Sequence, residues 1–291
     1  MAPIHPRLLE YLAPLQKERY FPGDLPLPEA RERFNAQMAP KPEGMRTEDR
    51  QLDDFTVRLY FPEGEGPHPV SLFFHGGGMV FGSTDTSDAL CWKLATRTPC
   101  IVVSVDYSLS PEVQYPVALE QGYRALEWTY QHCAEFGGDP RRIAVGGESS
   151  GAALATSVAI LARDRSGPDL CCQLLLQPVA SYGYGPSEDK WLLYPEKMEW
   201  FWDQHCPSRD AAVLPINHPL DHLPPAFFIL AEHDILTAGA LQLIEKMEGA
   251  TGRVYPGMIH GFCSLLPDFA PGDDALHEGI NHLKEEFEVQ A

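Results

Sequence analysis

A serine between two glycines is the first feature of this chain that could do chemistry. Ser149 lies in the pattern Gly147-x-Ser149-x-Gly151, a spacing typical of a sharp strand-to-helix turn that exposes a nucleophilic hydroxyl. A side chain at either glycine would collide with the crossing backbone. The pattern alone arises by chance about 0.1 times in a chain of this length. The prediction therefore depends on a strand before the serine and a helix after it.

Two further residues could activate this serine, which is a weak nucleophile until a base removes its proton. His260 lies in a glycine-flanked loop beyond a short predicted strand, and we expect it to be the base. Asp234 follows the apolar run 226–231 and is the expected acid, with Glu232 as the alternative. The chain order serine, acid, histidine is that of α/β-hydrolases and differs from those of chymotrypsin and subtilisin.

Three consecutive glycines follow another apolar run. The sequence His75-Gly76-Gly77-Gly78 comes directly after residues 70–74. It could be a flexible turn, or a loop whose backbone N–H groups bind an oxyanion, as in the HGGG motif of lipases and esterases. His75 ends a buried strand, so we expect it to brace the loop by hydrogen bonding rather than to act as a base.

Apolar runs and helical periodicity place these residues on a common scaffold. Strands are expected at residues 55–61, 70–74, 101–105, 142–146, 172–178 and 226–231 and at a short run, 253–255. Helices are expected at residues 88–97, 117–135, 150–163, 238–247 and 274–288, with a loop at 137–140. Ser149 therefore has the strand and the helix that its role requires. The fold class is α/β, with a mostly parallel sheet flanked by helices.

The N-terminal segment differs from the rest of the chain. Two short helices are expected between residues 6 and 40, and short helices cannot bury their apolar faces alone. The segment should therefore pack on the main domain, where it could also be a lid over a pocket. We divide the chain into an N-terminal helical cap segment, residues 1–45, and a catalytic domain, residues 46–291. A second cap contribution is expected around residues 183–222.

Composition excludes several classes of function. The 291 residues are 44% hydrophobic, and 22 Lys and Arg stand against 41 Asp and Glu, a formal charge of −19. This charge repels phosphate backbones and anionic membrane surfaces, so we expect no nucleic acid and no membrane partner. Seven cysteines without a C-x-x-C pair indicate reduced thiols. The N-terminus lacks the pattern of a signal peptide, and we expect a cytoplasmic protein.

Four ordered motifs together resemble the hormone-sensitive-lipase-like esterases, and most of all the bacterial acetyl esterases. They are His75-Gly76-Gly77-Gly78, residues 106–112, Gly147-Glu148-Ser149-Ser150-Gly151 and residues 255–262. The resemblance implies a carboxylic ester hydrolase for short acyl chains that needs no metal and no cofactor. It also implies that Ser149 is the nucleophile, His260 the base and Asp234 the acid. The backbone N–H groups of Gly76, Gly77 and Ser150 would form the oxyanion hole.

The substrate pocket is less well defined by these motifs. We expect a small-molecule ester to contact the four residues Met79, Trp200, Leu236 and Phe262, and aromatic residues between 191 and 202 either line this pocket or simply pack. A homodimer is the oligomer that we consider. Two other functions stay open: an amidase or lipid hydrolase with the same triad, and a hydrolase-like receptor that binds a small ligand without cleaving it, as the plant gibberellin receptors resemble this family.

Overall fold

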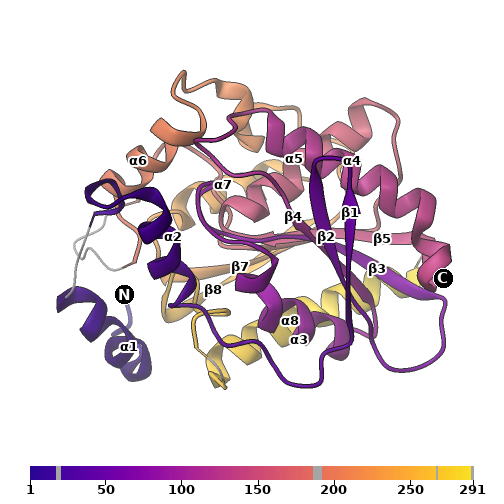
Figure 1. Ribbon diagram of the computed structural model, residues 1–291, viewed down its shortest axis with the longest axis horizontal. Coiled ribbons are helices and arrows are strands. Elements are labelled where there is room, and N and C mark those ends of the chain that lie inside the picture. The colour runs from indigo at the N-terminus through magenta and orange to yellow at the C-terminus, as the bar shows by residue number, and fades with distance from the viewer. Residues whose placement is uncertain (18–20, 186–191, 267, 290–291) are drawn as a thin grey trace.

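A single eight-stranded sheet forms the centre of the protein (Figure 1). The computed structural model describes residues 1–17, 21–185, 192–266 and 268–289. Within them the strands lie in the order β1-β2-β4-β3-β5-β6-β7-β8. Their bounds are β1 Thr47–Leu52, β2 Phe55–Tyr60, β3 His68–Phe74, β4 Ile101–Asp106, β5 Gly138–Glu148, β6 Gln173–Leu176, β7 Ala226–His233 and β8 Ala250–Ile259. β2 pairs antiparallel with β1 and β4, and every other pairing is parallel.

Helices cover both faces of the sheet (Figure 1). Their bounds are α1 Pro6–Lys17, α2 Leu27–Asn35, α3 Thr84–Arg97, α4 Val117–His132, α5 Ser150–Asp164, α6 Pro195–His205, α7 Thr237–Lys246 and α8 Ala270–Val289. Leu72 and Phe74 of β3 join the core beneath α4, α5 and α7. Phe73, which points the opposite way from the same strand, joins the core beneath α1, α3 and α8. This three-layer arrangement confirms the predicted α/β-hydrolase architecture.

Several elements differ from the expected ones for identifiable reasons. β1 has no apolar pattern, because it is a largely exposed edge strand held by its pairing with β2. Residues 138–140 were expected in a loop, but they begin β5, and Gly138 pairs with His68 of β3. β8 extends well beyond residues 253–255, since its parallel pairing with β7 starts at Ala250. Helix α6 was expected only as an aromatic-rich segment.

Helices α2 and α6 lie at the same end of the sheet, on the left in Figure 1. Ala30 of α2 and Phe201 of α6 belong to one cluster of buried residues. Arg31 anchors α2 to the loops below, because its guanidinium donates hydrogen bonds to the carbonyl oxygens of Val80 (2.9 Å) and Ser110 (3.0 Å). The N-terminal segment thus packs on the main domain, as its short helices require. Of the helices that the structure describes, none has the length and apolar character needed to cross a bilayer.

Candidate active site

The turn between β5 and α5 holds Ser149 in a strained conformation. Its φ of 57° and ψ of −119° lie in a region that residues with a side chain rarely adopt. A Cβ atom on Gly147 would lie 2.5 Å from the backbone of Gly151, and one on Gly151 would lie 2.1 Å from the carbonyl oxygen of Phe74. Only glycine fits at these two positions, and the serine hydroxyl stands clear of both elements as a result.

The structure brings Ser149, His260 and Asp234 into one hydrogen-bonded chain. Nε2 of His260 lies 2.9 Å from Oγ of Ser149, and Nδ1 of the same ring lies 2.7 Å from Oδ2 of Asp234. Oδ1 of Asp234 accepts a hydrogen bond of 2.9 Å from the N–H of Leu236. The carboxylate therefore fixes the ring with Nδ1–H toward the acid and an unprotonated Nε2 toward the serine.

Opposing effects act on the pKa of His260. Burial lowers this pKa, but the charge of Asp234 and its hydrogen bond outweigh burial and raise the pKa above its usual value. The Asp234 side chain is fully buried, with an exposed fraction of 0%, and the His260 side chain is 15% exposed. The carboxylate is thus shielded from water while the imidazole still reaches the cleft, which suits a base that must exchange protons with a substrate.

The alternative acid, Glu232, lies elsewhere. Its carboxylate accepts hydrogen bonds from the N–H groups of Ala2 (3.0 Å) and Gly257 (2.9 Å). These bonds lower the pKa of Glu232, the one from Gly257 most. Glu232 therefore joins the N-terminus to β8, and it is Asp234 that contacts the imidazole.

The glycine loop after β3 presents free backbone donors beside the serine. The N–H groups of Gly76 and Gly77 donate no hydrogen bond to any residue that the structure describes. A Cβ on Gly76 would lie 3.4 Å from Cβ of Ser149, and one on Gly77, which has a φ of 124°, would lie 2.1 Å from the carbonyl oxygen of Phe81. Ser150 is the first residue of α5, so its N–H has no partner within the helix. These three donors could bind an oxyanion at the serine.

His75 holds this loop in place. Its buried ring stacks on Tyr107 at a centroid distance of 4.2 Å, and Nδ1 donates to the carbonyl oxygen of Gly76 at 2.8 Å. The Tyr107 hydroxyl in turn donates to the carbonyl oxygen of His75 at 2.8 Å. Burial lowers the pKa of His75, which keeps the ring neutral. His75 therefore braces the backbone rather than exchanging protons.

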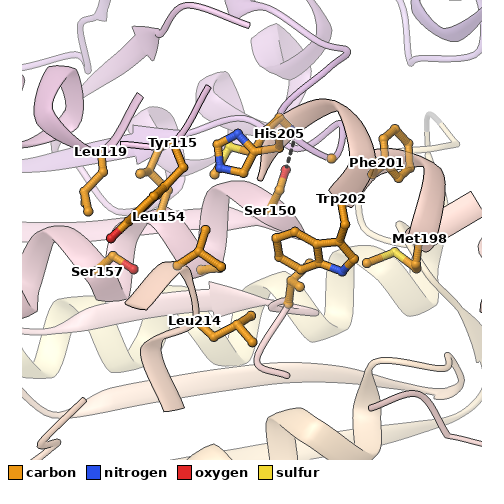
Figure 2. A pocket seen from close by; sticks show the side chains of 15 residues that line it. Tyr115, Leu119, Ser150, Leu154, Ser157, Met198, Phe201, Trp202, His205 and Leu214 are labelled. Atoms are coloured by element: carbon orange, nitrogen blue, oxygen red, sulfur yellow. Dashed lines mark hydrogen bonds between the residues drawn. The ribbon is translucent and has the colours of Figure 1, made fainter. Parts of the chain in front are cut away.

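Two cavities meet at the serine elbow. The first, which we call the apolar cavity, lies between α5 and α6, and Figure 2 shows Trp202 of α6 beside Leu154 of α5 and Leu214. Its free volume is about 40 Å³. It is lined by Gly78, Met79, Tyr115, Leu119, Ser150, Ala153, Leu154, Ser157, Val179, Met198, Phe201, Trp202, His205, Val213 and Leu214.

The second, which we call the catalytic cleft, contains the reactive side chains. Ser149, His260, Gly76 and Gly77 line it, together with Lys197 of α6. Its other lining residues are Phe34, Gln37, Met38, His75, Gly78, Thr86, Ser87, Glu148, Leu192, Leu193, Phe201, Gly261, Ser264 and Leu265. Its free volume is about 90 Å³. Phe201 and Gly78 line both cavities, so they form the partition between them.

The expected pocket residues differ in where they lie. Met79 lines the apolar cavity. Trp200, Leu236 and Phe262 are absent from the described linings of both cavities: Trp200 packs against Phe81 at 5.6 Å, and Leu236 and Phe262 are buried. The aromatic run also includes Trp191, which lies outside the described residues. Pattern alone did not distinguish aromatic packing from pocket lining.

Two interactions around the triad were not expected from the sequence. Oε1 of Glu148 accepts a hydrogen bond of 2.7 Å from the hydroxyl of Ser264. The Gln177 amide oxygen accepts one of 3.0 Å from the N–H of Gly261, the residue after the imidazole. Both join the loop after β8 to the strands beneath it, so they position His260. Lys197 was missed as well, and its only sequence signal is that it is the one lysine of an aromatic-rich stretch, residues 191–202, which also contains Glu196 and Glu199.

Known proteins are similar to this chain in sequence. A family model described as "alpha/beta hydrolase fold" matches residues 71–264. Carboxylesterase NlhH of Mycobacterium tuberculosis is 34% identical over 251 residues, which are 80% of this chain and 79% of the relative. An acetyl esterase of Salmonella schwarzengrund is 29% identical over 245 residues, 78% of this chain and 75% of the relative.

Solved structures of esterases superpose closely on this chain. A thermostable esterase from Pseudomonas putida superposes with a TM-score of 0.91 at 29% identity, over 98% of both chains. A hyperthermophilic esterase from Pyrobaculum calidifontis superposes with a TM-score of 0.89 at 31% identity, over 99% of this chain and all of the other. The resemblance therefore covers nearly the whole chain, the N-terminal segment as well as the sheet.

Proposed function

Since this chain belongs to the hormone-sensitive-lipase-like α/β-hydrolases, we propose that it hydrolyses short-chain carboxylic esters with Ser149 as nucleophile, His260 as base and Asp234 as acid. The chain is a carboxylesterase. The observation that supports these residue roles best is the chain of two hydrogen bonds, 2.9 Å and 2.7 Å, that ends at a strained serine beside unpaired N–H groups.

In the acylation step, Oγ of Ser149 attacks the ester carbonyl carbon while its proton moves to Nε2 of His260. The carbonyl oxygen becomes an oxyanion, which the N–H groups of Gly76, Gly77 and Ser150 stabilise. As the tetrahedral intermediate collapses, the bond to the alcohol oxygen breaks, and the imidazolium gives its proton to that oxygen. The products are the free alcohol and an acyl group bonded to Ser149.

Deacylation repeats these steps with water. His260 removes a proton from a water molecule, which attacks the acyl carbon, and the same N–H groups stabilise the second oxyanion. The bond to Oγ then breaks, and Ser149 regains its proton from the imidazolium. The carboxylic acid leaves and the enzyme returns to its starting state. Asp234 keeps its charge throughout, since its role is to orient and stabilise the imidazolium.

The two cavities suggest where each half of the ester lies. His260 must reach the oxygen of the leaving alcohol, so the alcohol portion belongs in the catalytic cleft, which contains the imidazole. The acyl chain then enters the apolar cavity beside Ser150 and Met79. The free volume of this cavity, about 40 Å³, is less than half that of the catalytic cleft, about 90 Å³, which favours short acyl chains over long ones.

The test is a series of 4-nitrophenyl esters from acetate to decanoate. We expect acetate, propionate and butyrate to give the highest kcat/KM and decanoate a value about a hundredfold lower. Ser149→Ala should reduce kcat by about 10⁵-fold or more for every ester, with unchanged far-UV circular dichroism. An organophosphonate should label the wild-type serine and leave the variant unlabelled.

The same series separates the other functions. A rate that rises towards decanoate would indicate a lipid hydrolase, and an equal rate on the matching nitroanilide would indicate an amidase. No ester cleavage together with no phosphonate labelling would indicate a small-ligand receptor.

Three further expectations belong to this proposal. Residues 1–45 and the segment around 183–222 act as the cap, as supported by Phe34 and Phe201, which line the catalytic cleft from α2 and α6.

The protein works in the cytoplasm, as supported by seven cysteines that are all buried and unpaired. A homodimer stays a prediction, and light scattering of the purified protein would give its mass.

A further inference from the structure

Lys197 places a positive charge inside the catalytic cleft. The residue lies in the first turns of α6 and lines the same cleft as Ser149 and His260. Its Nζ donates one hydrogen bond of 3.1 Å, to the carbonyl oxygen of Leu192. An ammonium has three N–H donors. No carboxylate of a described residue lies within ion-pairing distance of this Nζ, so the ammonium has bonding capacity to spare.

The surroundings of this ammonium are apolar. Leu192, Leu193 and Leu265 line the cleft, and the ring of Phe201 lies 6.0 Å from Nζ. Burial lowers the pKa of Lys197 to about 8, so most of the ammonium is charged at pH 7. A poorly solvated cation in such surroundings gains much from an anion that enters beside it.

Three other ionisable groups are in the described lining of the cleft: His75, Glu148 and His260. Burial lowers the pKa of His75 and keeps its ring neutral. Burial raises the pKa of the Glu148 carboxyl. The hydrogen bond that Glu148 accepts from Ser264 and the charge of His260 both lower this pKa, but only in part. His260 bonds to Asp234, and the charge of Lys197 lowers the pKa of the imidazole. The charge of Lys197 therefore lowers the pKa of His260, while neither Glu148 nor Asp234 forms an ion pair with Lys197. From the α2 side, the amide of Gln37 also lines the cleft and offers further N–H donors.

We propose that Lys197 is a specificity-determining residue that binds a carboxylate on the alcohol portion of the ester. This inference rests on the proposed function, which places the leaving alcohol in the catalytic cleft. The preferred substrates are then acetyl or similarly short acyl esters of hydroxy acids. The formal charge of −19 repels anions at long range. Salt screens that repulsion more than it screens a close contact with a half-buried ammonium.

The experiment compares two acetate esters of equal size. One is the acetate of 4-(hydroxymethyl)benzoate, which is an anion, and the other is the acetate of 4-(hydroxymethyl)benzamide, which is neutral. The readout is the ratio of kcat/KM for the anionic ester to that for the neutral ester. For the wild-type enzyme at pH 7 we expect a ratio of about ten, carried mainly by a lower KM.

Three variants test the origin of this ratio. Lys197→Met keeps an unbranched side chain that is one atom shorter and has no charge, and it should reduce the ratio to one or below. Lys197→Arg keeps the charge and should keep a ratio above one. Lys246→Met removes an exposed lysine at the end of α7 and is the matched control, with the wild-type ratio expected. Thermal unfolding of each variant checks that the fold is intact.

Two pH readouts would not respond to a merely structural role. The wild-type ratio should fall as pH rises from 7 to 9.5, because the ammonium loses its proton over that range. With the neutral ester, Lys197→Met should shift the acid limb of the pH profile to higher pH. The charge of Lys197 lowers the pKa of His260, and the variant removes that charge.

Each outcome decides the matter. A wild-type ratio near one, or a ratio that Lys197→Met leaves unchanged, overturns the inference while cleavage of the neutral ester still supports the proposed function. Failure of the wild-type enzyme to cleave either ester overturns the proposed function and this inference with it.

Discussion

The two cavities of this protein are neighbours of opposite character. The apolar cavity is small, and the only polar side chains in its described lining are Tyr115, Ser150, Ser157, Trp202 and His205. Burial lowers the pKa of His205 to about 4, so its ring is neutral at pH 7. The catalytic cleft is larger and contains the imidazole, a carboxyl group and an ammonium. The groups that can exchange protons or carry charge lie in the catalytic cleft. The apolar cavity can select a substrate mainly by the size of the group that enters it.

This difference follows from how each cavity is built. Side chains of α5 and α6 form much of the apolar cavity, and their volumes set its free space. The catalytic cleft is built where the loops after β3, β5 and β8 meet, at the carboxyl ends of parallel strands. Loops bring polar groups that a helix face in a core would not tolerate. Changes in the two regions should therefore have separable effects.

The largest effect should come from Asp234→Asn in the catalytic cleft. The amide would favour the wrong tautomer of His260, and kcat should fall by about 10⁴-fold for acetate and butyrate alike. Glu232→Gln is the matched control, because Glu232 binds backbone N–H groups away from the imidazole. A stopped assay of both variants on both esters checks this. A larger loss in Glu232→Gln would reverse the assignment of the acid.

Gly77→Ala should have the next largest effect, because it alters the loop where the two cavities meet. The new methyl group would lie 2.1 Å from the carbonyl oxygen of Phe81, at a φ of 124° that alanine rarely adopts. The loop must shift, and we expect kcat to fall by about 10²- to 10³-fold through the lost oxyanion donor. Gly137→Ala is a control with positive φ and open space around it, and it should affect stability only. Activity and thermal unfolding of both variants give the comparison.

A change in the apolar cavity should alter selectivity rather than chemistry. Ala153→Leu fills part of this cavity from α5, and we expect the ratio of kcat/KM for butyrate to that for acetate to fall about tenfold. Leu214→Ala removes a side chain from another part of the lining and should shift the ratio the other way. If both variants leave the ratio unchanged, the acyl chain does not occupy this cavity.

The smallest effect is a displacement of the pH profile, which belongs to the catalytic cleft alone. His260 accepts a proton only when neutral, so activity is lost as pH falls through its pKa. Because Asp234 raises that pKa despite the opposing effect of burial, the midpoint of the acid limb should lie above about 6.5. The profiles of kcat/KM for acetate and butyrate should coincide. Full activity at pH 5 would contradict the role of His260.

The sheet and the triad positions were predictable because their signals are local. β3 and β7 are nearly continuous apolar runs, as expected for strands buried on both faces. Asp234 directly follows β7, Ser149 follows β5 and His260 follows β8. The carboxyl ends of parallel strands meet at one edge of the sheet. The structure brings these residues together, while their roles stay predictions until the variants are measured.

The pocket was less predictable because it depends on how α2 and α6 pack against each other. Trp200 and Phe201 are adjacent in α6, yet Phe201 lines both cavities while Trp200 packs on Phe81. Which of the two rings faces the cavities depends on the orientation of α6 about its axis and on how α2 packs against it. A short sequence pattern determines neither. β1 illustrates the same limit, since an edge strand rich in charge is stabilised by its partner rather than by its own residues.

One aromatic ring separates the two cavities. Phe201 packs so closely on Gly78 that a Cβ there would lie 2.5 Å from Cδ1 of the ring, and little else is shared by the two linings. A bulky alcohol that pushes this ring would take room from the acyl chain, and a long acyl chain would do the reverse. Preferences for the two halves should thus be negatively correlated across a substrate matrix. A directed-evolution library at Phe201 would have to be screened on pairs of acid and alcohol, because a change at this shared position alters both preferences.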